Sequence, residues 1–217
     1  RLLKNHGNVI AANGTDGVAL RRKPGNVDWG RFRVAVEKDT PPFNLAKWID
    51  AHREELKPPV GNRNLYKASG DYIVMIVAGP NARKDYHYNE TEELFYQLEG
   101  NIEIHVQEGG KKKTLKLGPG DLYLHPAKVP HSPERHPDSI GLVIERRRDH
   151  LNLKDGLLWY CDNCNHKLHE VYFTLNDIEK DFLPHFENFY NSEALRTCDR
   201  CGTVMAADPR FTSTPDS

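Results

Sequence analysis

The chain has 217 residues, of which 38% are hydrophobic and 28% charged, and its formal net charge is −1. This balance is typical of a globular protein that can bury a core. No apolar run approaches the ~20 residues of a membrane-spanning helix, and the N-terminal residues lack the charged-then-apolar order of a secretory signal. We therefore expect a soluble, cytoplasmic protein with no membrane partner.

Positive charge is concentrated in the first 38 residues, which hold eight Lys or Arg against three Asp or Glu, a net of +5. The rest of the chain holds 22 against 28, a net of −6. A nucleic-acid-binding protein normally carries its positive charge on the folded part, so we expect no nucleic-acid partner. Residues 1–39 contain only short apolar pieces, and we treat them as an N-terminal extension without an assigned function.

The first expected element in chain order is a helix at residues 43–56. Hydrophobic side chains recur there at helical spacing, and Asn44 is a suitable N-terminal cap. The pair Pro58-Pro59 ends the helix, because the residue before a proline avoids the α conformation.

Short strands follow between residues 71 and 147. β-Branched residues dominate the first of them, as in a buried strand, and turns that contain glycine separate the later ones. The expected strands are 71–77, 94–98, 101–107, 114–117, 121–125 and 140–146. Many short strands with such turns indicate a sandwich or barrel, so we expect a mostly β protein whose barrel occupies residues 40–150.

The character of the sequence changes after residue 150. A strand is expected at 169–175, and Asn176 with Glu179 forms a capping box for a helix that runs to about residue 191. Two Cys-x-x-Cys pairs also lie in this part. We assign residues 151–210 to a small metal-binding subdomain and residues 211–217 to a disordered tail.

The cysteine pairs are Cys161 with Cys164 and Cys198 with Cys201, and Gly202 follows the second pair. Four thiolates at this spacing suit Zn or Fe, and the glycine permits the tight turn behind the sulfurs. In a cytosolic protein such pairs bind metal more often than they form disulfides. Four protein ligands leave no open position, and no basic helix accompanies them. We therefore expect a structural metal site rather than an electron carrier or a DNA-binding zinc ribbon.

A second candidate metal site lies in the expected barrel. His87 precedes a strand that begins near Glu93, and His131 follows a Gly-Asp turn, a strand and a proline. This spacing matches the two motifs of the cupin fold, which predicts a single cupin (jelly-roll) barrel. Two histidines and one carboxylate that leave coordination positions open suit non-haem Fe(II), which can then take up both O2 and a substrate.

Glu92 and Glu93 compete for the carboxylate position. Because side chains alternate along a strand, only one of the two points into the barrel. The Glu-x6-Gly spacing to Gly100 favours Glu93. Asp85 stands where many cupins have a further histidine, which leaves three protein ligands and a more open centre.

Several segments together resemble the 3-hydroxyanthranilate 3,4-dioxygenase family. The similarity runs from about residue 42 to residue 210, and the cysteine pairs are similar to those of its single-cupin form, which carries a rubredoxin-like second metal centre. The segments are KPPVGN at 57–62, GPNAR at 79–83, DYH at 85–87, EELFYQ at 92–97, PHSPER at 130–135, VIER at 143–146 and WYC at 159–161.

The resemblance implies a reaction. An enzyme of this family opens the ring of 3-hydroxyanthranilate with O2 and gives 2-amino-3-carboxymuconate semialdehyde. That product cyclises without an enzyme to quinolinate, the precursor of the NAD ring, and some bacteria use the same step to degrade nitroaromatic compounds. The resemblance also implies Fe(II) as the cofactor, an aromatic substrate and O2 as small-molecule partners, and a homodimer.

Site residues carry over by position. Arg83 and Arg135 resemble the arginines that bind the substrate, since a planar guanidinium matches a carboxylate bidentately. Glu145 resembles the catalytic carboxylate near the substrate amino group, where it can accept a proton. Asp85 is expected to orient Arg83 or a ligand histidine. The iron ligands of the family correspond to His87, Glu93 and His131.

Two other functions stay open on the sequence. The chain could be a non-catalytic cupin that binds or senses a small molecule, or another cupin enzyme such as a thiol dioxygenase or an isomerase.

The residues outside the candidate sites are expected to be structural. We expect the charge run Arg146, Arg147 and Arg148 on the surface and Phe95 and Tyr96 in the core. The histidines without an assigned role are His105, His125, His136, His166 and His169.

Overall fold

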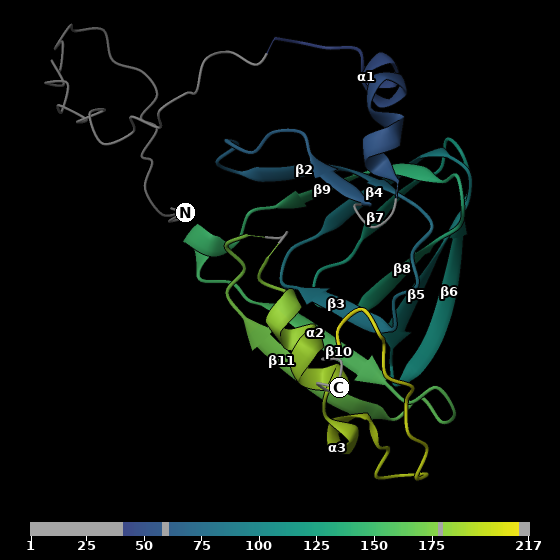
Figure 1. The fold of residues 1–217 in the computed structure, drawn as a ribbon. Coiled ribbons are helices and arrows are strands. Elements are labelled where there is room, and N and C mark those ends of the chain that lie inside the picture. Colours follow the sequence, from purple (N-terminus) through teal and green to yellow (C-terminus); the bar gives the residue numbers. More distant parts are fainter. Residues whose placement is uncertain (1–40, 58–60, 178–179, 213–217) are drawn as a thin grey trace, which may run out of the picture. The chain divides into compact units, whose positions relative to one another are not determined.

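The computed structural model describes residues 41–57, 61–177 and 180–212 (Figure 1). The expected N-terminal extension, most of the expected tail and Glu179 of the capping box lie outside these residues. The described strands are β1 (Asn62–Asn64), β2 (Tyr72–Ala78), β3 (Asp85–Asn89), β4 (Glu93–Glu99), β5 (Ile102–Glu108), β6 (Lys111–Leu117), β7 (Leu122–His125), β8 (His131–Arg135), β9 (Ile140–Arg146), β10 (Asp155–Tyr160) and β11 (Lys167–Phe173).

These strands form two antiparallel sheets that face each other (Figure 1). One sheet has the order β1-β2-β9-β4-β7, and the other has the order β11-β10-β3-β8-β5-β6. Strands that neighbour in space come from distant parts of the chain, as in β3 beside β8 and β4 beside β9. The mostly β cupin barrel predicted from the motif spacing is confirmed.

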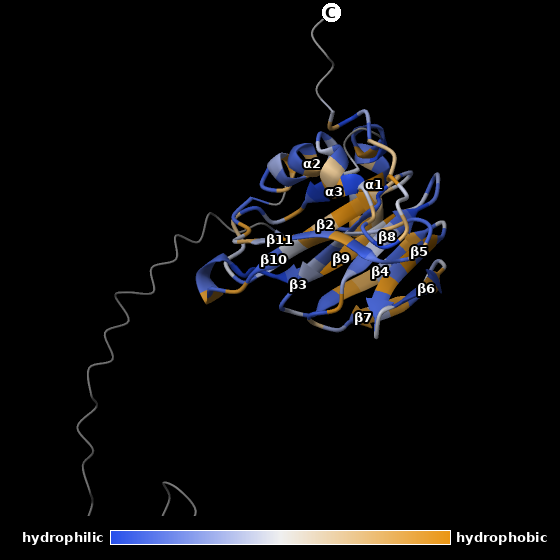
Figure 2. Ribbon diagram, turned by 90° about the horizontal axis from the view of Figure 1, so that it is seen from below, coloured by the Kyte–Doolittle hydropathy of each residue, from blue (hydrophilic) through white to orange (hydrophobic). Residues whose placement is uncertain are grey.

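The core between the sheets follows from alternation along the strands. Hydrophobic residues lie along strands of both sheets (Figure 2). On β4 the buried face carries Glu93, Phe95 and Gln97, whereas Tyr96 points outward and is 38% exposed. The expectation of a core position is confirmed for Phe95 and wrong for Tyr96, because adjacent strand residues face opposite sides. The main core cluster comprises Ile73, Met75, Phe95, Ile102, Ile104, Val106, Leu117 and Val143.

The first helix covers the outer face of the first sheet. It comprises α1 (Leu45–His52) and the 3₁₀ turn η2 (Arg53–Leu56). The Asn44 side chain accepts a hydrogen bond from the Lys47 amide at 3.0 Å, so the predicted cap is confirmed. Ile49 and Leu56 are buried against β2. No helix within the described ranges is long and apolar enough to cross a membrane.

The segment after residue 150 extends the barrel before it forms the cysteine site. Strand β10 pairs with β3 of the barrel and with β11, so part of the expected subdomain belongs to the second sheet. The helices α2 (Leu183–Tyr190) and α3 (Glu193–Arg196) follow. Trp159 of β10 stacks on Phe189 of α2 at 4.3 Å between ring centroids, which fixes this helix to the sheet.

The helix expected to begin at Asn176 begins only at Leu183, so that start was wrong. The Asp181 carboxylate accepts hydrogen bonds from the amides of Asn176 and Asp177 at 2.7 and 2.9 Å. These bonds satisfy the backbone in a turn rather than in the first turn of a helix.

Candidate metal centre and active site

Three buried side chains from three strands converge between the sheets. His87 lies in the middle of β3, opposite His131 at the start of β8, and Glu93 begins β4 in the facing sheet. Their ligand atoms all lie within 4.8 Å of one another. The His131 Nε2 atom lies 3.1 Å from Glu93 Oε2, and the His87 Nδ1 atom lies 3.9 Å from it. The predicted grouping is confirmed, and the exposed Glu92 takes no part in it.

Neighbouring groups hold each of these side chains in place. The His87 Nε2–H donates to Asp155 Oδ1 at 2.8 Å, which leaves the Nδ1 lone pair for the centre. Asn89 donates to Glu93 Oε2 at 3.1 Å, and the carbonyl of Val129 lies 3.4 Å from His131 Nδ1. Carboxylate and carbonyl partners of this kind orient metal-binding histidines. The donor set fits a divalent transition metal with open coordination positions.

The charge states suit a cation. Burial alone would raise the pKa of Glu93, but the adjacent His131 and His87 outweigh it and lower the pKa to about 2. Burial lowers the pKa of His87, against the hydrogen bond to Asp155 that raises it. At neutral pH the centre therefore presents an ionised carboxylate and a neutral imidazole, the forms that bind metals.

Arg148 is a buried residue beside the centre, so its expected place on the surface was wrong. It is 2% exposed. The Nε and Nη2 atoms donate to the Asp155 carboxylate at 3.0 and 2.6 Å, and the Nη1 atom lies 2.8 Å from Glu145 Oε2. The neighbouring Arg146 is exposed, as expected. The sequence alone does not distinguish Arg148 from the other two arginines, because the two carboxylates that compensate its buried charge come close to it only in the fold.

A cavity of about 120 Å³ adjoins the three converging side chains. It contains the three residues expected at a substrate site, which come from the β2–β3 loop, β8 and β9: Arg83, Arg135 and Glu145. The other residues that line it are Asn62, Met75, Val77, Asn81, His87, Glu93, Phe95, His131, Pro133, Val143 and Phe182.

The two arginines of this cavity differ in their partners. Arg83 is held by Asp85, to which Nε donates at 3.2 Å and Nη2 also donates. Arg135 is 2% exposed, and its Nε and Nη1 atoms have no hydrogen-bond partner among the described residues. Burial lowers the pKa of Arg135 to about 10, so the guanidinium is still charged at neutral pH. A buried cation with two unused donors suits an anionic ligand.

Glu145 lies on the strand next to Glu93, and the two residues are cross-strand partners. Burial, and after it the negative charge of Glu93, raise the pKa of Glu145 to about 8, against the opposing charge of Arg148. A carboxyl group with a raised pKa in a cavity can accept and release a proton near neutral pH.

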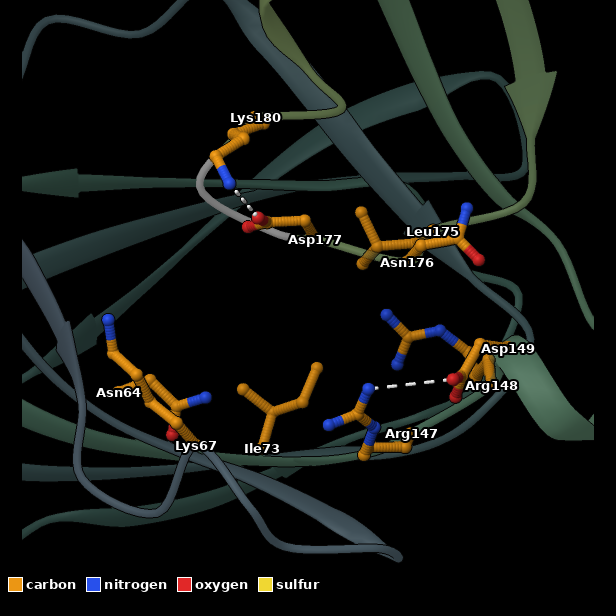
Figure 3. A pocket seen from close by; sticks show the side chains of 10 residues that line it. All are labelled: Asn64, Lys67, Ile73, Arg147, Arg148, Asp149, Leu175, Asn176, Asp177 and Lys180. Atoms are coloured by element: carbon orange, nitrogen blue, oxygen red, sulfur yellow. Dashed lines mark hydrogen bonds and ion pairs between the residues drawn. The ribbon is translucent and has the colours of Figure 1, made fainter.

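A larger cavity of about 280 Å³ is lined by residues of β1 and β2 and of the segments that follow β9 and β11 (Figure 3). Four of its charged groups pair with one another: Arg147 with Asp149, and Lys180 with Asp177 (Figure 3). Arg148 also lines it, but the donors of Arg148 are taken up by Asp155 and its neighbours. The smaller cavity is therefore the candidate active site.

The four cysteines form a second cluster, as predicted. Their sulfur atoms lie within 4.8 Å of one another, with 3.6 Å between Cys161 and Cys201 and between Cys164 and Cys198. The residue after each pair has a positive φ: 56° at Asn165 and 74° at Gly202. The first turn uses an asparagine, which tolerates this conformation better than most residues. The set fits a tetrahedral four-thiolate metal site.

The facing sheets with a His/Glu/His set between them define a metal-binding cupin. A sequence model of one family, described as 3-hydroxyanthranilic acid dioxygenase, matches residues 37–190. The chain belongs to this family, which is a family of enzymes.

Two curated relatives agree with this assignment. A 3-hydroxyanthranilate 3,4-dioxygenase of Xanthomonas euvesicatoria pv. vesicatoria (strain 85-10) is 51% identical over 81% of this chain and 98% of its own length. One of Bacillus cereus (strain ATCC 10987 / NRS 248) is 42% identical over 78% and 94%. Among solved structures, a cupin-2 domain-containing protein of Shewanella frigidimarina NCIMB 400 is 20% identical, with a TM-score of 0.39 over 46% of this chain and 92% of its own.

Proposed function

We propose that this chain is an Fe(II)-dependent dioxygenase that opens the ring of 3-hydroxyanthranilate with O2 to give 2-amino-3-carboxymuconate semialdehyde. One observation carries the proposal: the metal-binding set His87, Glu93 and His131 adjoins the same cavity as the buried, unpartnered guanidinium of Arg135. A substrate with a carboxylate on an aromatic ring can contact both. The relatives named for this reaction support it.

The donor set supports ferrous iron as the metal. Two histidines and one carboxylate with open positions are the ligand type of non-haem Fe(II) oxygenases. When bound, ferrous iron supplies the redox chemistry that allows O2 to react with an electron-rich aromatic ring. We assign Fe or Zn to the four-cysteine site, in a structural role.

We assign substrate binding to Arg135 and Arg83. The Nε donor of Arg135, with Nη2 on the same edge of the guanidinium, can bind the substrate carboxylate bidentately, which also compensates the buried charge. Arg83 is held by Asp85 at the same cavity and adds a second positive charge. A lysine could not replace either side chain fully, because an ammonium lacks the planar pair of donors.

We assign proton transfer to Glu145. Its raised pKa and its place in the cavity suit a group that takes a proton from the substrate. The Nη1 atom of Arg148 lies 2.8 Å from Glu145 Oε2 and holds the carboxylate in place. Both atoms of O2 end in the product, so the reaction needs no external electrons.

Three further assignments go with this proposal. The product cyclises to quinolinate, a precursor of the NAD ring, and we assign the enzyme to the kynurenine pathway of NAD synthesis, with aromatic degradation as the alternative use of the same step. Metal-binding cysteines suit a reducing compartment, and we place the enzyme in the cytoplasm. We propose a homodimer, for which the outer face of β4 and β7 offers apolar side chains: Tyr96, Leu122 and Leu124 are 38%, 65% and 53% exposed.

An oxygen electrode combined with metal analysis tests the proposal. Freshly iron-loaded protein should consume O2 and 3-hydroxyanthranilate in equal amounts while the absorbance of the semialdehyde grows. His131→Ala should abolish turnover and barrel iron but keep the metal on the four cysteines. Absence of turnover by iron-loaded protein would contradict the proposal, and binding of an aromatic acid without O2 uptake would favour a sensor.

A further inference from the structure

Gln97 is a buried amide in the barrel to which the reaction assigns no role. It lies on the same face of β4 as Glu93 and is 1% exposed. Its Nε2 atom donates to the carbonyl oxygens of Glu99 at 2.7 Å and Gly100 at 3.2 Å. Because two acceptors take up the nitrogen end, the orientation of the amide is fixed. The opposite atom, Oε1, is buried and has no hydrogen-bond partner among the described residues.

The Gln97 oxygen and the Arg135 guanidinium both lie against Gly141, beside the position that a Cβ atom would take there. A Cβ atom at Gly141 would lie 2.8 Å from Arg135 Nη1 and 2.9 Å from Gln97 Oε1. Gly141 of β9 and Gln97 of β4 are cross-strand partners, which fixes this arrangement in the sheet. The backbone of Gly141 is not in the left-handed region. The close approach of two side chains, rather than backbone conformation, therefore accounts for the glycine.

The polar atoms at this point complement each other. Arg135 Nη1 is a buried donor and Gln97 Oε1 a buried acceptor, and neither has a hydrogen-bond partner in the described part of the chain. Such groups are costly to bury unless they are satisfied. A guanidinium that binds a carboxylate with one edge still has N–H groups on the other side. Because Nη1 and the fixed amide oxygen lie beside the same point at Gly141, a shift of the guanidinium towards the amide lets this oxygen accept from Nη1.

We propose that Gln97 and Gly141 are positioning residues for Arg135, and that they make the cavity selective for aromatic rings that carry a carboxylate. Gly141 leaves the space for the guanidinium, and Gln97 accepts from Nη1 when the substrate carboxylate is bound. A ring without this carboxylate leaves the buried cation uncompensated and is bound less well. This inference rests on the proposed function.

The variant Gly141→Ala tests the space requirement. The test compares kcat/KM for 3-hydroxyanthranilate with kcat/KM for 2-aminophenol, which keeps the hydroxyl and amino groups but lacks the carboxylate. The added methyl displaces the guanidinium, and a displacement of about 1 Å can cost up to ~100-fold. The ratio should fall about 10- to 100-fold, chiefly through KM, with little change for 2-aminophenol. Gly70→Ala is the matched control, because a Cβ there meets nothing within 4 Å.

The variant Gln97→Met tests the amide oxygen and keeps the inference testable if Gly141→Ala does not fold. It should lower the same ratio. Gln107→Met is its control. Gln107 is also a buried amide, but it lies on β5 of the other sheet and pairs with Asn165. Loss of that pair should affect stability without changing the ratio.

Binding gives a readout apart from turnover. The dissociation constant of anthranilate, measured by calorimetry on iron-loaded protein without O2, should rise in Gly141→Ala and Gln97→Met and stay unchanged in the controls. An unchanged ratio and dissociation constant, or an equal loss for both substrates, would overturn the inference. If the wild type turns over neither substrate, the proposed function fails, and the anthranilate measurement alone decides the inference.

Discussion

Arg148 and Asp155 form a buried ion pair next to the candidate metal centre, with two hydrogen bonds between the guanidinium and the carboxylate. Asp155 also accepts from His87, and Arg148 also contacts Glu145. One guanidinium therefore connects a candidate iron ligand to the candidate proton acceptor. Both side chains are at most 1% exposed, so water does not screen the pair.

Removal of the Arg148 charge should destabilise the protein strongly. Arg148→Met leaves two buried carboxylates without their partner, and breaking a buried pair in this way costs about 3–5 kcal/mol. Arg147→Met is the matched control, because Arg147 is partly exposed and its pair with Asp149 is worth about 1 kcal/mol or less. Urea denaturation measures both. An equal loss of unfolding free energy in the two variants would show that the buried Arg148 pair stabilises the protein no more than the exposed Arg147 pair.

The three converging ligands could be predicted from the sequence because short-range rules fix them. Alternation along β4 lets only one of Glu92 and Glu93 face inward, and the spacing to Gly100 favours Glu93. The motif spacing also brings His87 and His131 to the same region. The cysteine cluster could be predicted for the same reason, since each pair is local. These features depend little on how distant segments pack.

The features that could not be predicted depend on distant partners. Strands β3 and β8 have the sequences DYHYN and HSPER, and most of their inward side chains are polar because they face the metal centre and the cavity. Hydrophobic alternation is therefore absent from both strands. Arg148 likewise resembles a surface residue until the fold places Asp155 beside it. Because functional residues replace hydrophobic ones on the inward face of β3 and β8, hydrophobic alternation does not predict these two strands.

Activity should depend on pH through Glu145. Burial and the charge of Glu93 raise its pKa to about 8. A bound cation would offset the charge of Glu93 and so lower the pKa of Glu145, while the effect of burial stays. A proton acceptor must be ionised, so kcat/KM should rise with pH through this pKa. Glu145→Gln should lose that rise together with about 10²- to 10⁴-fold of the activity.

The pH profile of kcat/KM for 3-hydroxyanthranilate measures this effect. Glu134→Gln is a suitable control, because Glu134 belongs to the neighbouring β8 but is exposed and pairs with His105. It should keep the wild-type profile. A Glu145→Gln enzyme with the same ascending limb as the wild type would assign the proton transfer to another group.

The four-cysteine site should be needed for stability and not for turnover. Cys201→Ser removes one of four thiolates, so the metal bound there should fall from one per chain towards zero, and the melting temperature should fall with it. The variant that stays folded and iron-loaded should keep the wild-type kcat. Metal analysis, thermal melting and turnover on the same sample test this. A loss of kcat at full barrel iron would indicate an electron-transfer role instead.

Asp155 should control iron affinity through His87. Asp155→Asn keeps the size of the side chain and an oxygen that can accept from His87 Nε2, but it removes the negative charge that makes the imidazole a stronger ligand. Loss of such a partner costs about 10- to 100-fold in metal affinity. Competition against a chelator measures this for Fe(II). Asp162→Asn removes a carboxylate that pairs with Lys84 at the surface, and it should leave the iron affinity unchanged. If Asp155→Asn binds iron as tightly as the wild type, the hydrogen bond alone orients His87 and the charge of Asp155 serves only to compensate Arg148.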